Sequence, residues 1–354
     1  MHQRGTDHQP TFSQLRGRQV GAALVLVLVV VFASALVGAA NLSPRAVVFD
    51  LLDLVPGITL DSGLTPSQHA ILTQIRLPRI VLAFVVGAAL SGSGAAYQGT
   101  FRNPLADPYL LGVAAGAGLG AVIVIAYGTG LTGLAEAFAL PLAAFVGALG
   151  AVALAWFVGR SLGGRTATSL ILAGVAVASF LTAVQTFILQ RADESLREVY
   201  GFILGRLSTA GWGEVLLVTP YVVVSLLVIL RHRRLLDVMA VGEAESAVLG
   251  IDPRKVRTRV VLAATLATAA AVSVSGLIGF VGIIVPHTVR LLVGGSNRIV
   301  IPLSIIGGGA FLVAADIVAR LALSPAELPI GVVTAFFGAP FFAIVLRTSK
   351  RLVG

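Results

Sequence analysis

Residues 231–257 read RHRRLLDVMAVGEAESAVLGIDPRKVR and form a long polar stretch between two apolar runs. Six basic residues stand at its two ends: Arg231, Arg233, Arg234, Arg254, Lys255 and Arg257. Basic residues beside apolar spans mark the cytoplasmic side of a membrane protein, because Lys and Arg are rarely translocated. We therefore expect residues 231–257 to connect two membrane spans on the cytoplasmic face.

The middle of this stretch, VGEAESAVLG, is typical of a short amphipathic helix. Four apolar side chains fall roughly on one face: Val241, Ala244, Val248 and Leu249. Pro253, after Gly250, favours a break and a second short segment. A pair of short helices tied to the membrane at both ends predicts a docking surface for another protein. A solvated connecting loop is the alternative.

Composition defines the class of protein. The chain has 354 residues, of which 57% are hydrophobic and 12% charged, and its mean hydropathy is +0.96. A soluble domain carries roughly twice that charged fraction, so the sequence predicts an all-α, polytopic membrane protein. The net charge of +9 need not indicate a nucleic-acid partner, since the basic residues cluster at span ends. The absence of cysteine excludes disulfides, thiolate metal sites and Cys nucleophiles.

Apolar runs of span length divide the chain into about ten membrane segments. We place them at 20–40, 80–96, 110–127, 140–158, 170–189, 215–230, 260–279, 280–292, 301–319 and 330–346. The run 280–292 is short for a crossing and contains Pro286, and 202–212 is a surface segment. We expect a cytoplasmic tail at 1–19, a single transmembrane domain at 20–354 and both termini in the cytoplasm.

Small residues recur every fourth position in two of the expected spans. One ladder is Gly87, Ser91, Ala95 and Gly99, and the other is Gly112, Gly116 and Gly120. Such ladders let helix backbones approach closely where no hydrophobic effect drives them together. Simple tolerance of glycine in membrane helices is the alternative.

The sequence lacks the groups that would energise transport within the chain. Its only lysines, Lys255 and Lys350, are not in a P-loop motif, and no span has a carboxylate near its middle. A secondary carrier usually needs buried ionisable groups for its ion. Asp316 and Arg320, spaced i, i+4 near a span end, are suited to pair with each other. The energy for transport should therefore come from another subunit.

Arg76 and Arg79, in IRLPR, precede a span at its external end, where arginines are disfavoured. Arg320 belongs to the same end. We interpret the three as a basic rim that recognises acidic groups on an external partner. Snorkelling to lipid headgroups, or internal neutralisation of Arg320 by Asp316, are the alternatives.

Several blocks resemble the signature of the FecCD-type permeases, the membrane subunits of ABC importers for ferric siderophores, haem and cobalamin. They are RLPRIVLAFVVGAALSGSGAAYQGTFRNPLADPYLLGVAAGAG at 76–118, LGIDPRKVR at 249–257, GLIGFVGIIVPHTVRLLVG at 276–294, ADIVARL at 315–321 and AELPIGVVTAFFGAPFFAIVLR at 326–347. The resemblance covers roughly residues 76–351, in the family's order. It implies a type II ABC importer permease fold of ten helices in the bacterial cytoplasmic membrane, dimerised around a central path.

The resemblance also implies partners and site residues. Two cytoplasmic ATPases, which bind the ATP and Mg²⁺, would dock on the loop that contains Gly242, Glu243, Leu249, Gly250, Asp252, Pro253 and Arg254. A periplasmic or lipoprotein solute-binding protein would dock through glutamates on Arg76, Arg79 and Arg320. The cytoplasmic gate would lie at Asn103, Leu105, Thr168 and Ser169, the second pair being the looser match.

The resemblance implies a non-catalytic subunit that binds no cofactor or metal of its own and lies in membrane lipid. Ferric siderophore is the first choice of cargo, because it is the commonest cargo among relatives. Haem and cobalamin follow. A secondary carrier or channel, or a membrane scaffold, remain the other function classes, and a homodimer or a pairing with a paralogue are both open.

Overall fold

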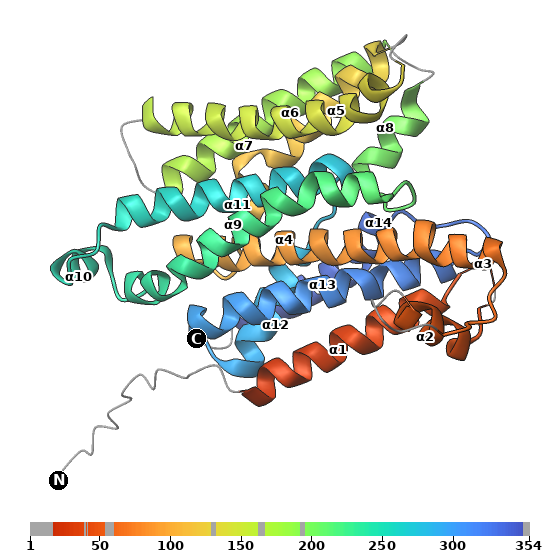
Figure 1. Cartoon of the computed structure of the whole chain (residues 1–354). Coiled ribbons are helices and arrows are strands. Elements are labelled where there is room, and N and C mark those ends of the chain that lie inside the picture. The colour runs from red at the N-terminus through yellow and green to blue at the C-terminus, as the bar shows by residue number, and fades with distance from the viewer. Residues whose placement is uncertain are drawn as a thin grey trace.

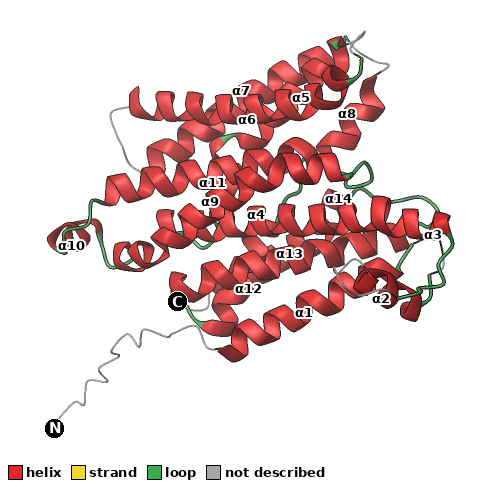
Figure 2. Ribbon diagram, in the orientation of Figure 1, coloured by secondary structure: helices red, strands yellow, loops and turns green. Residues whose placement is uncertain are grey.

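The computed structural model describes residues 17–38, 40, 42–53, 60–128, 132–161, 167–191 and 195–349. Within these ranges the regular elements are helices, and the one extended pairing is an isolated bridge between Leu323 and Ala326 (Figure 2). The all-α prediction is therefore confirmed. Residues 1–16 of the expected tail, together with Lys350 and Arg351, lie outside the described residues.

Ten apolar helices correspond to the ten expected spans. Seven described helical segments are long and apolar enough to cross a membrane, and three apolar helices are shorter. In chain order the ten are α1 (Gly17–Leu36), α4 (Leu77–Phe101), α5 (Val113–Tyr127), α6 (Leu134–Ser161), α7 (Ala167–Leu189), α9 (Trp212–Met239), α11 (Pro253–Ser275), α12 (Val281–Val293), α13 (Asn297–Leu321) and α14 (Ile330–Ser349).

Short elements join these helices. They are α2 (Pro44–Asp53), α3 (Pro66–Ala70), the π-helix η1 (Ile71–Arg76), the 3-10 helix η2 (Pro108–Leu111), α8 (Leu196–Ile203) and α10 (Glu243–Val248). The elements α3, η1 and α4 form one continuous helical run, so this span begins at Pro66 rather than near residue 80. Thr65 starts the run with a capping box to Gln68.

The long helices run side by side in layers (Figure 1). Helices α5, α6 and α7 pack together on one side, α4, α9, α11 and α13 fill the middle, and α1 lies against α13 on the other side. In the most apolar 18-residue segment of the α3–η1–α4 run, 83% of the residues are buried. In the corresponding segment of α1, 11% are buried. Helix α4 is therefore the centre of the bundle.

Both small-residue ladders lie at close helix contacts. A Cβ at Gly87 on α4 would overlap the backbone of Gly308 on α13. A Cβ at Gly116 on α5 would overlap the backbone of Gly147 on α6. No hydrophobic effect drives apolar helices together in lipid, so such close approach gives the packing its specificity. The interpretation of close packing, rather than tolerance of glycine, is confirmed.

The two ends of the bundle differ. Helix α10 lies at the end where α1 begins and α14 ends, which we call the α10 end (Figure 1). Helices α2, α3 and α8 lie at the opposite end, which we call the α3 end. The 28-residue helix α9 runs between the two ends, from Trp212 to Met239.

The central polar stretch has a different local structure from the expected pair of short helices. Its first nine residues, 231–239, are the last turns of α9. The short helix around VGEAESAVLG is present as α10. Pro253 does not open a second short segment but stands in the first turn of the 23-residue helix α11. Asp252 caps that helix through the backbone N–H groups of Arg254 and Lys255, and proline is favoured in a first turn because its missing N–H would be unpaired there.

Candidate functional site

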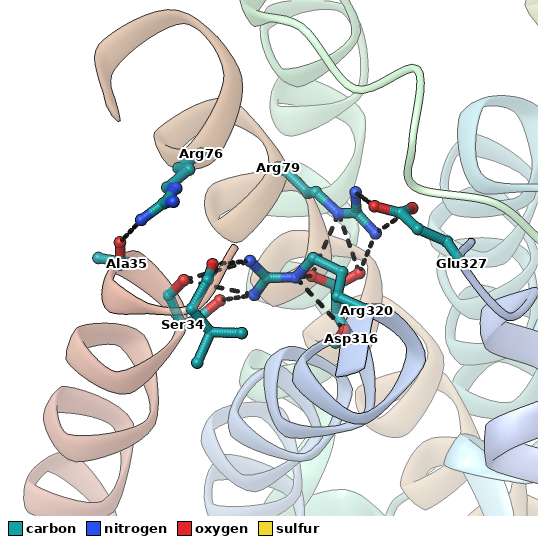
Figure 3. A network of polar contacts seen from close by, with 8 residues as sticks. Ser34, Ala35, Arg76, Arg79, Asp316, Arg320 and Glu327 are labelled. Carbon is teal, nitrogen blue, oxygen red and sulfur yellow. Dashed lines mark hydrogen bonds and ion pairs between the residues drawn. The ribbon is translucent and has the colours of Figure 1, made fainter. Parts of the chain in front are cut away.

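Arg79 lies between two carboxylates at the α3 end (Figure 3). Its Nη2 donates to Asp316 Oδ1 on α13 at 2.8 Å, and its Nη1 donates to Glu327 Oε1 at 2.9 Å. Both carboxylates receive two N–H groups of this guanidinium, the paired geometry that arginine makes best. The Asp316 side chain is 1% exposed and that of Glu327 is 38% exposed. Glu327 is thus the accessible partner of Arg79.

Arg320 and Arg76 hold the end of α1. Arg320 Nη1 donates to the carbonyl of Val37 at 2.6 Å, and its Nη2 donates to Ser34 Oγ at 2.6 Å. Arg76 Nη1 donates to the carbonyl of Ala35 at 2.6 Å. The last carbonyls of a helix have no partner within the helix and carry partial negative charge, so cations stabilise them. No basic residue lies in the last turn of α1, and two arginines from other helices supply the cap.

The π-helix η1 orients these arginines. It ends at Arg76, two residues before Pro78, and a π turn shifts the register of the side chains that follow. The indole Nε1 of Trp212, at the start of α9, donates to the carbonyl of Thr73 within η1 at 2.9 Å. Arg76 consequently points toward α1 while Arg79 points toward α13 (Figure 3).

The three arginines of the expected rim are largely buried in this structure, and their role in docking stays a prediction. Arg76 is 5% exposed, and the Arg79 and Arg320 side chains are 12% and 8% exposed. Arg320 Nε binds Asp316 Oδ2 at 3.0 Å, which is the internal neutralisation held open as an alternative. Burial favours this arrangement, because a guanidinium in a water-poor site needs a paired charge or carbonyl acceptors. Glu327 was missed, because no spacing pattern in the sequence pairs it with Arg79.

The loop around α10 presents apolar side chains to its surroundings. Val248 is 87% exposed and Leu249 is 67% exposed. A hollow of about 660 Å³ beside them is lined by Ala244, Ala247, Gly250, Ile251, Asp252, Pro253 and Arg254. Hydrogen bonds from the backbone of Lys255, then its side chain and charge, hold the pKa of Asp252 below its usual range. Four of the seven predicted docking residues thus line one concave surface, Leu249 is exposed beside it, and Gly242 and Glu243 start α10.

The expected gate residues lie at the α10 end. Asn103 follows α4 and accepts a hydrogen bond from the backbone N–H of Leu105 at 2.9 Å. Thr168 is exposed and Ser169 half-buried in the first turn of α7. The helix η2, which follows Leu105 in the chain, packs against α7 near Gly174. A Cβ at Gly174 would overlap the carbonyl of Leu110 in η2. The two gate segments are therefore linked through η2.

A model of the family described as the FecCD transport family matches residues 26–348. The chain belongs to the FecCD transport family. Its similarity extends to individual permeases of this family. It is 42% identical to the cobalamin import system permease protein BtuC of Halobacterium salinarum over 81% of this chain and 76% of that one. It is 34% identical to the hemin transport system permease protein HmuU of Yersinia pestis over 95% of this chain and 97% of that one.

A solved structure of another transporter has the same fold as this FecCD permease. A metal-chelate type ABC transporter in an inward-facing conformation matches with a TM-score of 0.81 and 28% identity, over 94% of this chain and all (100%) of that chain. The protein is therefore a multi-pass membrane permease of the metal-chelate ABC importer type. Within the described ranges, this FecCD chain has no group of three or more His, Asp or Glu side chains that could hold a metal ion.

Proposed function

We propose that this FecCD permease moves a ferric siderophore, as an intact chelate, inward across the bacterial cytoplasmic membrane, driven by ATP hydrolysis in two partner subunits. The family match over residues 26–348 carries the proposal. The chemistry of the described spans supports it, because their carboxylates lie near helix ends, as Asp237 and Asp316 do. A carrier that uses an ion gradient would need such groups near mid-membrane.

The α10 end is the cytoplasmic end in this proposal. Six basic residues of the central stretch lie at or near this end, at the close of α9 and the start of α11: Arg231, Arg233, Arg234, Arg254, Lys255 and Arg257. The positive-inside rule assigns such an end to the cytoplasm. The exposed Val248 and Leu249 and the hollow beside them fit an ATPase subunit, since exposed apolar groups rimmed by charge are typical of docking surfaces.

The α3 end then faces the solute-binding protein. A hollow of about 270 Å³ there is lined by Arg79, Arg206, Asp316 and Glu327, among others. We propose that a glutamate of the partner competes with Glu327 for Arg79, because Glu327 is the exposed member of the pair. Arg76 and Arg320 would support docking from beneath, by holding α1 in place.

A second copy of the permease would complete the path. Helix α7 carries three exposed hydroxyl residues, Ser179, Thr182 and Thr186, at helical spacing on one face. Ser179 and Thr186 donate to carbonyls within α7, so these groups are satisfied in the free subunit. A row of hydroxyl groups on an exposed helix face suits a wall facing a water-filled path between two subunits.

Cobalamin is the second candidate cargo, favoured by the 42% identity to the Halobacterium salinarum permease. A direct test uses the complex of this permease with its cognate ATPase and solute-binding protein. The measurement is ATP-dependent uptake of a radiolabelled ferric hydroxamate, haem and cobalamin into proteoliposomes. Uptake of the ferric hydroxamate alone is the expected result, and uptake of cobalamin or haem alone would replace the proposed cargo.

A further inference from the structure

The N-terminus of α13 is capped by a residue from another helix. Asp237, in the last turn of α9, accepts the backbone N–H of Asn297 at 2.5 Å and that of Arg298 at 3.3 Å. It also accepts the hydroxyl of Ser296 at 2.8 Å. Ser296 holds the N-cap position of α13 but makes no side-chain hydrogen bond to its own helix. The free N–H groups and the positive end of the α13 dipole are therefore satisfied by α9.

The cap is largely shielded from solvent and is part of a larger polar cluster. The Asp237 side chain is 10% exposed, and Arg298 Nε lies 3.6 Å from its Oδ2. Arg290, on α12, donates to Asn297 Oδ1 at 2.9 Å and to Gln98 Oε1 on α4 at 3.4 Å. Four helices thus meet at this cluster. A carboxylate that accepts several hydrogen bonds away from water makes a stronger link than an exposed one.

The turn of α9 that carries Asp237 is tied to α10 through the neighbouring residue, Val238. Ser246, in α10, donates through its hydroxyl to the carbonyl of Val238 at 3.1 Å and to that of Gly242. Ser246 is fully buried, although its neighbours in α10 are exposed. A displacement of α10 therefore acts on the turn of α9 that carries Asp237.

Helix α13 leads from this cap to the other end of the molecule. It contacts α4 closely along its length, where Gly308 meets Gly87 and Ser91. Its last turns carry Asp316 and Arg320, which hold Arg79 and the end of α1. One packed helix thus connects the α10 loop with the cluster at the α3 end.

We propose that Asp237 is a positioning residue that transmits movement of the α10 loop to α13, and so couples the ATPase end to the solute-binding-protein end. This inference rests on the proposed function. The alternative is that Asp237 only stabilises the start of α13. The two accounts predict different values of one quantity, the stimulation of ATP hydrolysis by the solute-binding protein. If Asp237 only stabilises the start of α13, this stimulation should be normal in any variant complex that folds.

The test compares wild type with Asp237→Asn in complexes reconstituted in nanodiscs with the ATPase and the solute-binding protein. Asparagine fills the same volume but brings an NH₂ group to face N–H donors. We expect complex yield to match wild type and stimulated hydrolysis to fall about fivefold or more. A fivefold change corresponds to the lower end of typical coupling free energies. Ser296→Ala, which keeps both backbone contacts, should cause a smaller loss. Gly150→Ala on α6, where no atom lies within 4 Å of the added Cβ, is the control and should match wild type.

Normal stimulation in folded Asp237→Asn complex would overturn the proposal. If this variant does not fold, Asp237→Cys with Ser296→Cys gives a second test, in which the permease has no other cysteine to react. A short thiol cross-linker should restore the coupling that the uncross-linked form lacks, and failure to restore it would also overturn the proposal. A wild-type complex without stimulation would instead count against the proposed function.

Discussion

Asp316 on α13 binds Arg79 on α4 through Oδ1 and Nη2 at 2.8 Å, although the two residues are 237 positions apart in the chain. The same carboxylate binds Arg320 at 3.0 Å, so one buried anion serves two arginines. The three arginines that the sequence suggests as a basic rim therefore belong to a largely buried network. Glu327 is the accessible acid of that network.

Asp316→Asn should destabilise the protein strongly. The change leaves Arg79 and Arg320 without their shared counter-ion, and breaking a buried ion pair from one side costs about 3–5 kcal/mol. Glu327→Gln is the matched control, because Glu327 is 38% exposed and exposed pairs contribute about 0–1 kcal/mol. Thermal unfolding in detergent compares the two, and equal melting temperatures would show that Asp316 is not the centre of the network.

Glu327→Gln should strengthen docking of the solute-binding protein. Removing the charge frees Arg79 for a glutamate of the partner, so the affinity should rise while Arg79→Ala lowers it. High salt should weaken both the wild-type and the Glu327→Gln interaction, since exposed charges are screened over about 8 Å at physiological ionic strength. Titration of the partner into nanodiscs measures the affinity. Weaker docking by Glu327→Gln would mean that Glu327 is itself a docking residue.

Charge reversal in the α10 loop should weaken ATPase association. Arg254 lines the hollow beside α10, and Glu243 begins that helix. We expect Arg254→Glu and Glu243→Lys to lower the yield of complex in a pull-down through the ATPase, and Leu249→Ser to do the same by removing an exposed apolar contact. Normal yield across all three variants would place the ATPase elsewhere.

Gly87→Ala should destabilise the bundle because the added methyl group would overlap the backbone of Gly308. Gly150→Ala on α6 is the control, since no atom lies within 4 Å of the added Cβ. Alanine is favoured over glycine inside a helix by about 0.5–1 kcal/mol, so the control should be neutral or more stable. A lower melting temperature for Gly87→Ala and an equal or higher one for Gly150→Ala are the expected outcome, and a stable Gly87→Ala variant would show that α4 and α13 can separate slightly.

Residue periodicity and composition predicted the number of spans well, because each membrane helix must satisfy its own backbone in about 20 residues. They predicted helix ends poorly where helices continue past the apolar run. Residues 231–239 stay helical although they contain Arg231, Arg233 and Arg234, since arginine is a good helix former. The π turn of η1 leaves no periodic pattern in the sequence. The directions in which the Arg76 and Arg79 side chains point could therefore not be predicted.

Contacts between distant segments were the other limit. The pairing of Asp316 with Arg320 follows from their spacing along one helix. The contacts of Arg79 with Glu327 and of Asp237 with Asn297 join helices that only the folded structure brings together. Ser296 holds the N-cap position of α13, but its hydroxyl donates to Asp237 on α9.

The most direct test of the central claim is chelate uptake by proteoliposomes that contain the permease with its ATPase and solute-binding protein. The account predicts uptake that requires ATP and both partners, and that is unaffected by collapsing proton and sodium gradients. Uptake by the permease alone, driven by either gradient, would contradict it.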